Sequence, residues 1–516
     1  MGAMTDRPRA GHPALAAALS FLFPGLGQAY AGQGLLAAVL ATPVLLLAII
    51  VIVALAFGAD SLRNQALSSS FLGGLLVLDV ALALWRLFAI AQAGFAQPMG
   101  MRPAISGTAA IGQAGPGAAA VTDSGVAAPR DGGDRARRAV TLSFVVLLLA
   151  LTLAMHAYLF LVVRELNTTL GQVFDVGKPS TANSTTAPIN QPDYHWNGTE
   201  RINLLLLGID SGPGRQEALS DTILVVSVDP VARTAALISI PRDTGFVPLP
   251  DRHVYADGRY PQKINQLASD AAANAALWCP DLTDAHTCGI RTLERSVGLY
   301  LGIGLQYYAQ VDLAGFAKLI DALGGVRLCL DGDLVDPTYT DPARPGRMGI
   351  TLAAGCHRYS GTDALAFARI RKGYLQLPDG TQQAQNDFKR AERQQEVLLA
   401  LRSEFATGDV IFQLPGILSA IGQTVATDFP RDKVGDLATL LPLITGPDIE
   451  RVVLGYPEYV GEPTDPEVNY LLRPKRSAIR AEMARLFGGD LEGWYLGSTA
   501  AGPPRSSTST APSSAP

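Results

Sequence analysis

Residues 202–244 read INLLLLGIDSGPGRQEALSDTILVVSVDPVARTAALISIPRDT, and this stretch decides the fold class. Three short apolar runs, at 202–207, 222–228 and 235–240, are separated by segments rich in Gly, Pro and charged residues. Short, largely apolar runs of this kind are typical of strands buried on both faces. Further candidate strands lie at 326–330 and 364–368.

Helical patterns alternate with these strands. Residues 313–323 combine apolar and polar positions and end at Gly324-Gly325, where glycine suits a helix C-terminus. Residues 386–405 are a strongly helical mixture of charged and apolar side chains. Alternation of this kind predicts an α/β fold, an α-β-α sandwich around a central sheet. Ligands in such folds gather at the loops that follow strand ends.

The N-terminal third of the chain is apolar in a different way. Long apolar runs cover 34–57, 71–95 and 139–163, each long enough for a membrane core that needs roughly 20 helical residues. Residues 14–30 carry Phe-Pro-Gly-Leu-Gly-Gln and resemble the Pro-Gly-x-Gly-Gln-x-Tyr pattern of small two-helix membrane modules. They could form an interfacial or re-entrant segment, or a fourth, kinked span. The sequence therefore predicts an all-α membrane region of three, possibly four, helices.

Two charged residues interrupt the second span. Asp79 and Arg86 are seven residues apart and share one helix face. Charged groups inside a span are costly and mark functional sites or pairs. We expect a mutual or interhelical ion pair.

Basic residues predict the orientation. The loop at 97–138 ends in a cluster of arginines, Arg135 to Arg138, that abuts the third span. Cytoplasmic loops carry an excess of Lys and Arg, so this loop is predicted to be cytoplasmic and the chain after residue 163 extracytoplasmic. The predicted organisation is a membrane region at 1–163, an outer linker at 164–199, a folded outer domain at 200–489 and a disordered tail at 497–516.

The bulk composition narrows the function classes. The 516 residues carry a net charge of -5, which gives no support to nucleic-acid binding. Four cysteines lie between 279 and 356, which favours an oxidising compartment, although four buried thiols are the alternative. No Cys-x-x-Cys spacing occurs and only six histidines are present, so a zinc site is not expected.

Two acids mark the ends of the first two predicted strands. Asp210 follows the first apolar run directly, and Asp221 opens the second. If the strands are neighbours, the two carboxylates can converge and bind Mg²⁺, which takes one or two carboxylates plus substrate phosphate. The alternative is that each acid caps a turn. Arg242-Asp243, after the third run, is either part of the same site or a local ion pair.

Arginines gather in the second half of the domain. Arg369 and Arg371 end the predicted strand at 364–368 and, at a period of two, would point to one face. Arg390, Arg393 and Gln394 are spaced i, i+3 and i+4, so they share a helix face. Arginine is suited to bidentate phosphate contacts, so we expect a phosphate site rather than a merely solvated helix face.

These stretches, in this order, resemble the LytR-CpsA-Psr family of cell-wall glycopolymer transferases. The resemblance covers 201–489. The matching motifs are LLLLGID (204–210), SDT (220–222), SIPRDT (239–244), KIN (263–265), DALGGV (321–326), SGTDALAFARIRKG (360–373) and NDFKRAERQQ (386–395).

The resemblance implies a membrane-anchored phosphotransferase. It would move a glycopolymer from a polyprenyl diphosphate carrier to a cell-wall acceptor such as peptidoglycan, with Mg²⁺ as cofactor and membrane lipid around it. The implied catalytic residues are Asp210, Asp221, Arg242 and Arg371, with Asp210 and Asp221 beside the metal. The implied diphosphate-binding residues are Arg242, Lys263, Arg369, Arg371, Asp387, Arg390, Arg393 and Gln394. Two disulfides are expected, Cys279–Cys288 and Cys329–Cys356, and the resemblance favours the second.

The chain departs from the family pattern at three places. Leu219 stands where an arginine usually precedes Ser-Asp, Ser211 follows the first acid where an arginine is frequent, and the stretch at 373–385 is longer. Arg215 is a candidate substitute for one of those arginines. Two other functions stay open for this reason: hydrolysis of the polyprenyl diphosphate, and a non-catalytic polyprenyl-phosphate-binding role in the cell envelope.

Overall fold

The computed structural model describes most of the chain in two compact units. One unit holds residues 1–62 and 70–164, and the other holds 63–69 and 165–516. The described residues are 12–57, 67–95, 131–174, 200–210, 219–341, 346, 348–405, 414–434, 436, 449–464 and 470–488.

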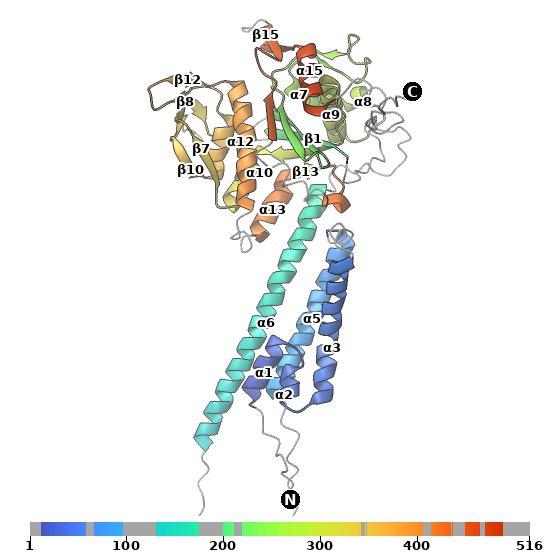
Figure 1. Ribbon diagram of the computed structural model, residues 1–516, viewed down its shortest axis with the longest axis vertical. Helices are drawn as coiled ribbons and strands as arrows, with labels where there is room; N and C mark the ends of the chain where they lie inside the picture. The colour runs from blue at the N-terminus through green and yellow to red at the C-terminus, as the bar shows by residue number, and fades with distance from the viewer. Residues whose placement is uncertain are drawn as a thin grey trace, which may run out of the picture. The chain divides into compact units, whose positions relative to one another are not determined.

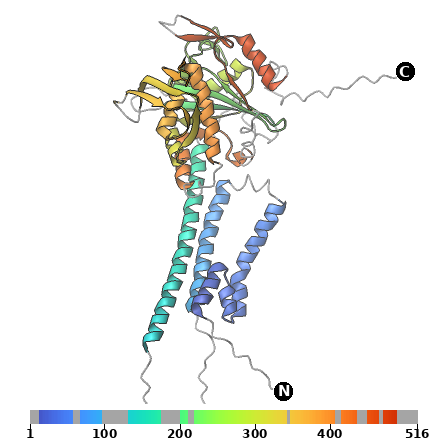
Figure 2. The same cartoon turned by 60° about the vertical axis from the view of Figure 1, so that its left-hand side comes forward.

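The first unit is built from apolar helices. Its helices are α1 (Pro13–Leu22), α2 (Leu26–Tyr30), α3 (Gly34–Phe57), α5 (Ser69–Phe95) and α6 (Asp131–Phe174). In the described part of the chain, three of them, α3, α5 and α6, are long and apolar enough to cross a membrane. Figure 1 and Figure 2 show α6 as one unbroken helix, which is longer than the predicted span at 139–163. Residues 165–174, assigned to a linker from sequence, are its last turns.

The segment at 14–30 forms two short helices instead of one span. α1 ends at Leu22, before Pro24, and Gly25, with a left-handed φ of 101°, is the N-cap of α2. With 10 residues, α1 is roughly 15 Å long, about half of a hydrocarbon core. Gln28 is fully buried; it accepts from Ser20 and donates to the Ala89 carbonyl and to Gln92. The motif glutamine thus joins the short helices to α5.

The charged residues of α5 find separate partners. Asp79 pairs with His156 of α6 at 2.7 Å, and Arg86 donates to the Phe21 carbonyl of α1 at 2.6 Å. The predicted pairing is therefore interhelical, and Asp79 and Arg86 do not neutralise each other.

The second unit is organised around a mixed sheet. In the described residues this sheet has six strands, in the order β13-β6-β1-β2-β3-β14. Antiparallel pairs join β1 to β2, β2 to β3 and β13 to β6, whereas β1–β6 and β3–β14 are parallel. The bounds are β1 (Ile202–Asp210), β2 (Leu219–Asp229), β3 (Thr234–Ser239), β6 (Tyr307–Asp312), β13 (Val425–Thr427) and β14 (Ile449–Val453).

Both faces of the sheet are covered, which confirms the predicted α-β-α sandwich. Alternate residues of β1 point to opposite faces, so Leu205 and Leu207 enter one core and Ile202 enters another. The first core includes α7 (Ile264–Ala273), α9 (Ala285–Leu301) and α15 (Arg476–Phe487). The opposite face receives α12 (Asp387–Phe405), drawn in orange in Figure 1. The predicted strands at 202–207, 222–228 and 235–240 and the helix at 386–405 are confirmed.

Smaller elements flank the sandwich and carry a third core. The helices there are α10 (Leu313–Ala322), α11 (Gly361–Arg369) and α13 (Leu414–Thr424). The strands are β7 (Val326–Leu330), β8 (Asp333–Thr340), β9 (Met348–Leu352), β10 (Gly355–Tyr359), β11 (Tyr374–Gln376) and β12 (Gln382–Ala384). Remaining elements are α8 (Ala275–Trp278), η2 (Arg431–Lys433), β4 (Val247–Pro248), β5 (Arg259–Tyr260), β15 (Val460–Thr464) and β16 (Leu471–Pro474).

The predicted strand at 364–368 is wrong, because these residues belong to α11. The Ser360 hydroxyl accepts from the Asp363 amide at 3.2 Å and caps the helix, and Asp363 lies in its first turn. Ala364, Phe367 and Ala368 are buried at the spacing i, i+3 and i+4, which is a helical face. The other candidate, 326–330, is a strand, but β7 pairs with β10 outside the central sheet.

Candidate functional site

A cavity of about 290 Å³ lies within the second unit, between one face of the sheet and helices α10, α11 and α12. This volume is at the lower end of the range for small-molecule sites. Its apolar lining residues are Leu206, Leu219, Leu224, Val311, Leu313, Phe316, Leu365, Ala368, Val397 and Leu398. Its polar lining residues are Asp221, Thr222, Arg242, Arg369, Arg371, Arg390 and Gln394. An apolar wall and an arginine-rich set of polar groups thus share one cavity.

Asp221 enters the cavity from an irregularity in β2. Gly208 pairs with Thr222 and Ile209 pairs with Ser220, so Asp221 is the extra residue of a β-bulge. Bulges redirect side chains at sheet edges and binding sites. Gly208 is required at the same point, because a Cβ there would lie 2.8 Å from the Thr222 side chain. The bulge therefore places the carboxylate at the cavity.

The two acids predicted to converge lie on neighbouring strands. Asp210 pairs with Leu219 through the backbone at the end of β1. The Asp210 side chain lies outside the described residues, as does Arg215. Leu219 lines the cavity with an apolar side chain where the family pattern has arginine.

Arg242, which follows β3, links the acids of the site. Its Nη1 lies 2.7 Å from Asp221 Oδ1, and its Nε lies 3.5 Å from Asp387 Oδ1 at the start of α12. Arg390, one turn further along α12, approaches Asp387 Oδ1 at 3.0 Å and donates to the Asp221 carbonyl at 3.1 Å. Arg242 is therefore not paired only with Asp243, whose Oδ2 is 3.9 Å from its Nε. The result is an alternating network of acids and arginines.

A second layer supports this network. Asn265 Nδ2 lies 3.5 Å from Asp221 Oδ1, and Lys263 Nζ lies 2.7 Å from Asp243 Oδ1. Both belong to the KIN stretch (263–265) at the start of α7. Lys263 and Asp387, predicted to bind diphosphate, do not line the cavity. Lys263 pairs with Asp243, and Asp387 pairs with Arg242 and Arg390, which do line it. Asn265 was not among the predicted site residues, although it belongs to a quoted motif, whereas Asp243 was expected either in the site or in a local ion pair.

The two carboxylates on Arg242 differ in their electrostatics. Burial by itself would raise the pKa of Asp221, but Arg242 and Arg390 and the hydrogen bonds of Arg242 and Asn265 lower it on balance. Burial dominates at Asp387 and raises its pKa despite the same two arginines. Asp221 is thus the carboxylate that stays ionised over the wider pH range.

Arg369 and Arg371 reach the cavity from the end of α11. Arg369 is the last residue of the helix and Arg371 lies just beyond it, exposed. Both arginines line the cavity, as predicted, but they do so from the end of a helix and not from alternate positions of a strand. Gln394 of α12 also lines the cavity and donates to the Ala368 carbonyl at 3.3 Å.

Arg393 has a different position from its predicted neighbours. It is 6% exposed and does not line the cavity. Its Nε donates to the Phe367 carbonyl at 2.8 Å, and its two other nitrogens donate to the Ile370 carbonyl and to Gln385 Oε1. Burial lowers the pKa of Arg393 to about 10, so it remains charged at neutral pH. Arg393 therefore holds the end of α11, which carries Arg369 and Arg371.

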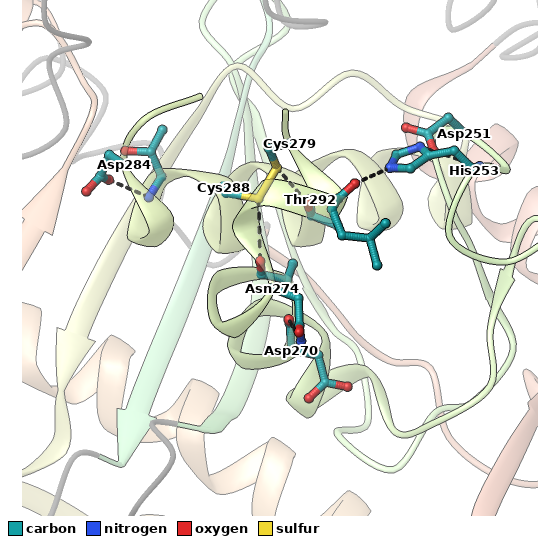
Figure 3. The surroundings of a disulfide bond; sticks show 11 residues. Asp251, His253, Asp270, Asn274, Cys279, Asp284, Cys288 and Thr292 are labelled. Carbon is teal, nitrogen blue, oxygen red and sulfur yellow. Dashed lines mark hydrogen bonds and ion pairs between the residues drawn. A yellow bond between two sulfur atoms is a disulfide. The ribbon is translucent and has the colours of Figure 1, made fainter. Parts of the chain in front are cut away.

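Both predicted disulfides are present. Cys329–Cys356 joins directly paired residues of β7 and β10. Figure 3 shows Cys279–Cys288, which ties the end of α8 to the first turn of α9. Asp284 caps α9 beside it by accepting from the Thr287 amide at 2.7 Å.

Comparisons with known proteins agree with this architecture. The LytR_cpsA_psr family model matches residues 172–461, more than half of the chain. The regulatory protein MsrR of Staphylococcus aureus (strain COL) is 30% identical over 234 residues, 45% of this chain and 57% of that protein. The chain thus spans little more than half the length of MsrR.

Other relatives carry transferase names. The polyisoprenyl-teichoic acid--peptidoglycan teichoic acid transferase TagU of Oceanobacillus iheyensis is 28% identical over 294 residues, 57% of this chain and 78% of that protein. Among solved structures, Bacillus subtilis TagV has a TM-score of 0.42 and 22% identity, covering 57% of this chain and 99% of TagV. The chain belongs to the LytR-CpsA-Psr family, as its motifs predicted.

Proposed function

We propose that the chain is a cell-wall glycopolymer transferase that takes its glycan from a polyprenyl diphosphate carrier. The observation that carries the proposal is the cavity in which apolar walls meet Arg242, Arg369, Arg371 and Arg390. A polyprenyl diphosphate has the same division between apolar chain and anionic head. Membership of the family, and the transferase name of the O. iheyensis relative, support this class of reaction.

In the proposed reaction, an acceptor hydroxyl attacks the phosphorus that bears the glycan. The bond from that phosphorus to the bridging oxygen breaks, polyprenyl phosphate leaves with the electron pair, and the hydroxyl proton passes to solvent or a base. Phosphoryl transfer depends mainly on positioning and charge stabilisation. Arg369 and Arg371 would hold the diphosphate, and Arg242 and Arg390, fixed by Asp387, would meet charge that develops on the transferring group.

Mg²⁺ fits the donor set at Asp221. Mg²⁺ binds through one or two carboxylates together with substrate phosphates and water, and would supply charge neutralisation between the phosphates. Asp221 is a carboxylate at the cavity whose pKa is lowered, and the Oδ1 atom of adjacent Asn265 is a buried acceptor with no hydrogen-bond partner. Among the described residues, no three His, Cys, Asp or Glu side chains form a metal cluster. The ion would therefore be held by Asp221, with Asp210 as the second candidate, and by the substrate.

The proposed location is the cell membrane, with several spans and the second unit on the extracytoplasmic side. Three long apolar helices support anchoring. The arginines at 135–138 support a cytoplasmic loop before α6. Disulfides in the second unit suit an oxidising compartment.

The test uses the full chain in lipid nanodiscs, a synthetic prenyl diphosphate-linked disaccharide as donor and uncross-linked peptidoglycan chains as acceptor. Transfer of the labelled disaccharide to peptidoglycan, lost in Arg371→Ala and kept in Arg485→Ala, supports the proposal. Arg485 is a matched surface arginine that pairs with Glu482 and Glu450. Donor cleavage at the same rate with and without peptidoglycan would make the protein a hydrolase. Donor binding without turnover would make it a binding protein.

A further inference from the structure

Tyr470 lies beside the catalytic arginine, although no motif points to it. It directly precedes β16, and Leu472 of β16 forms a parallel bridge with Thr244. The Leu472 amide donates to the Asp243 carbonyl at 2.9 Å, and the Gly245 amide donates to the Leu472 carbonyl at 3.0 Å. Arg242 and Asp243 belong to a turn that is closed by the Thr244 amide donating to the Pro241 carbonyl at 3.1 Å. The Leu472–Asp243 hydrogen bond therefore brings Tyr470, two residues before Leu472, close to this turn.

The electrostatic surroundings of the phenol agree with that position. Burial raises the pKa of Tyr470, and the negative charges of Asp243 and Asp387 raise it further. These two acids are ion partners of Arg242. Nevertheless 39% of Tyr470 remains exposed, and the residue does not line the cavity. Tyr470 thus lies outside the cavity, beside its polar end.

The segment between Arg242 and β4 is strained. Phe246 has a φ of 56°, a left-handed conformation that is an outlier for a bulky side chain. The Arg473 guanidinium of β16 lies 5.5 Å from the centroid of the Phe246 ring, and the Phe246 amide donates to the Tyr260 carbonyl at 3.0 Å. Strained backbone persists where surrounding structure enforces it, and such residues cluster at functional sites. Here the two backbone hydrogen bonds of Leu472, with Asp243 and Gly245, hold β16 against the turn after Arg242.

The geometry of phosphoryl transfer places the donor and the acceptor on opposite sides of the reacting phosphorus. The attacking and leaving oxygens lie roughly in line across the phosphorus. The leaving polyprenyl phosphate occupies the cavity in the proposed function, so the acceptor must approach from outside it, past Arg242. Tyr470 is an aromatic side chain, 39% exposed, beside the turn that carries Arg242 and outside the cavity. Lys263, whose side chain is 30% exposed, and Asp243 add polar groups beside it.

We propose that Tyr470 forms an acceptor subsite, in which its ring stacks on a pyranose ring of the acceptor glycan and aligns the hydroxyl with the phosphorus held by Arg242. A tyrosine ring offers an apolar face and a polar tip, which matches a sugar ring with apolar C–H faces and hydroxyl edges. This inference rests on the proposed function, since it names where the acceptor of that reaction binds.

The experiment separates the KM for acceptor from the KM for donor. It uses the full chain in nanodiscs, with the prenyl diphosphate-linked disaccharide and uncross-linked peptidoglycan chains. Tyr470→Ala should raise the KM for peptidoglycan by roughly 3- to 10-fold, the range of one aromatic contact, while the KM for donor stays within about twofold. Tyr470→Phe keeps the ring and should restore the wild-type KM. Val231→Ala is the control, because Val231 is 75% exposed in the turn after the opposite end of β2.

An unchanged KM for acceptor in a folded Tyr470→Ala protein overturns the subsite, as does an equal rise in both KM values. If Tyr470→Ala melts early, Tyr470→Leu, which keeps apolar volume without a flat ring, replaces it and must show the same selective effect. If the wild type turns over no donor, the proposed function has failed. The subsite can still be tested in that case, by measuring how much labelled protein pellets with peptidoglycan. Wild-type pelleting that Tyr470→Ala loses supports the subsite, and pelleting equal in both, or absent in both, overturns it.

Discussion

Arg371 and Arg393 lie in one basic region of the sequence, but the structure predicts opposite results when each is replaced by alanine. Arg371 is exposed and lines the cavity, whereas Arg393 is 6% exposed and bonds the backbone at the end of α11. Arg371→Ala should therefore remove turnover and leave stability unchanged. Arg393→Ala should destabilise the domain.

The magnitudes follow from the contacts. Loss of one charge-assisted contact made in the transition state costs on the order of 2–4 kcal/mol, or roughly 30- to 1000-fold in rate, for Arg371→Ala. Arg371→Lys should fail nearly as badly, because lysine keeps the charge but lacks the planar fork. Arg393→Ala leaves three acceptors without their donor: the carbonyls of Phe367 and Ile370 and the Gln385 side chain. At about 1–3 kcal/mol for each buried unsatisfied group, with partial rescue by water, the loss is about 3–5 kcal/mol.

Two measurements on the same proteins check this contrast. Thermal melting of the second unit should fall by about 10 °C for Arg393→Ala and by less than about 2 °C for Arg371→Ala. Turnover per folded molecule should fall in Arg371→Ala and also, to a smaller degree, in Arg393→Ala, because the end of α11 loses its support. A normal melting temperature together with abolished turnover in Arg393→Ala would refute the structural role of this arginine. Normal turnover in folded Arg371→Ala would refute the proposal that Arg371 holds the diphosphate.

Three further perturbations test other parts of the molecule. An impermeant thiol reagent on intact cells should label a cysteine introduced after residue 163 but not one introduced at 97–138; the reverse pattern contradicts the topology. Burial raises the pKa of Asp428 to about 6, so its contribution to stability is complete below about pH 4 and is lost as the pH rises through 6. Asp428→Asn should therefore stabilise the domain by about 2–3 kcal/mol at pH 7.5 and leave it unchanged at pH 4, as measured by denaturant unfolding at both pH values. Replacing Cys329 and Cys356, 27 residues apart, by serine should cost about 3–4 kcal/mol by the loop-entropy relation, and equal unfolding midpoints would contradict it.

The helix at 386–405 was predictable because its pattern is long, and the central strands were predictable because their short apolar runs are separated by segments rich in Gly, Pro and charged residues. The run at 364–368 was not, since a five-residue apolar stretch fits a strand or a turn and a half of helix equally well. The deciding signal was nevertheless present, because Ser360 followed three residues later by Asp363 is a helix N-terminus signature. The helix containing 139–163 was underestimated for another reason: a helix that leaves an apolar region need not end there, and α6 continues to Phe174.

The site was predictable at the level of residue types and less so at the level of contacts. Spacing put Arg390 and Arg393 on one face of α12, and both are buried there. Their partners come from different elements: Arg390 meets Asp387 and the bulge in β2, while Arg393 meets the end of α11. Tertiary packing decides which partner each arginine contacts, and no local sequence pattern encodes that choice. The bulge that directs Asp221 into the cavity is hidden in the sequence for the same reason.

The charge pattern of the cavity explains how a carboxylate can belong to the proposed phosphate site. Four arginines and one aspartate are among the described residues that line it. Without a ligand, like charges this close would repel one another, and the acids Asp221 and Asp387 relieve that repulsion by pairing with Arg242. When a diphosphate binds, Asp221 becomes a like charge beside it, a repulsion that a divalent cation shared by the carboxylate and the phosphates would reverse. Asp387 lies behind the arginines and need not move, so it can keep Arg242 and Arg390 aligned in both states. The same network thus stabilises the site without a ligand and, under the proposed function, would make donor binding depend on a cation at Asp221.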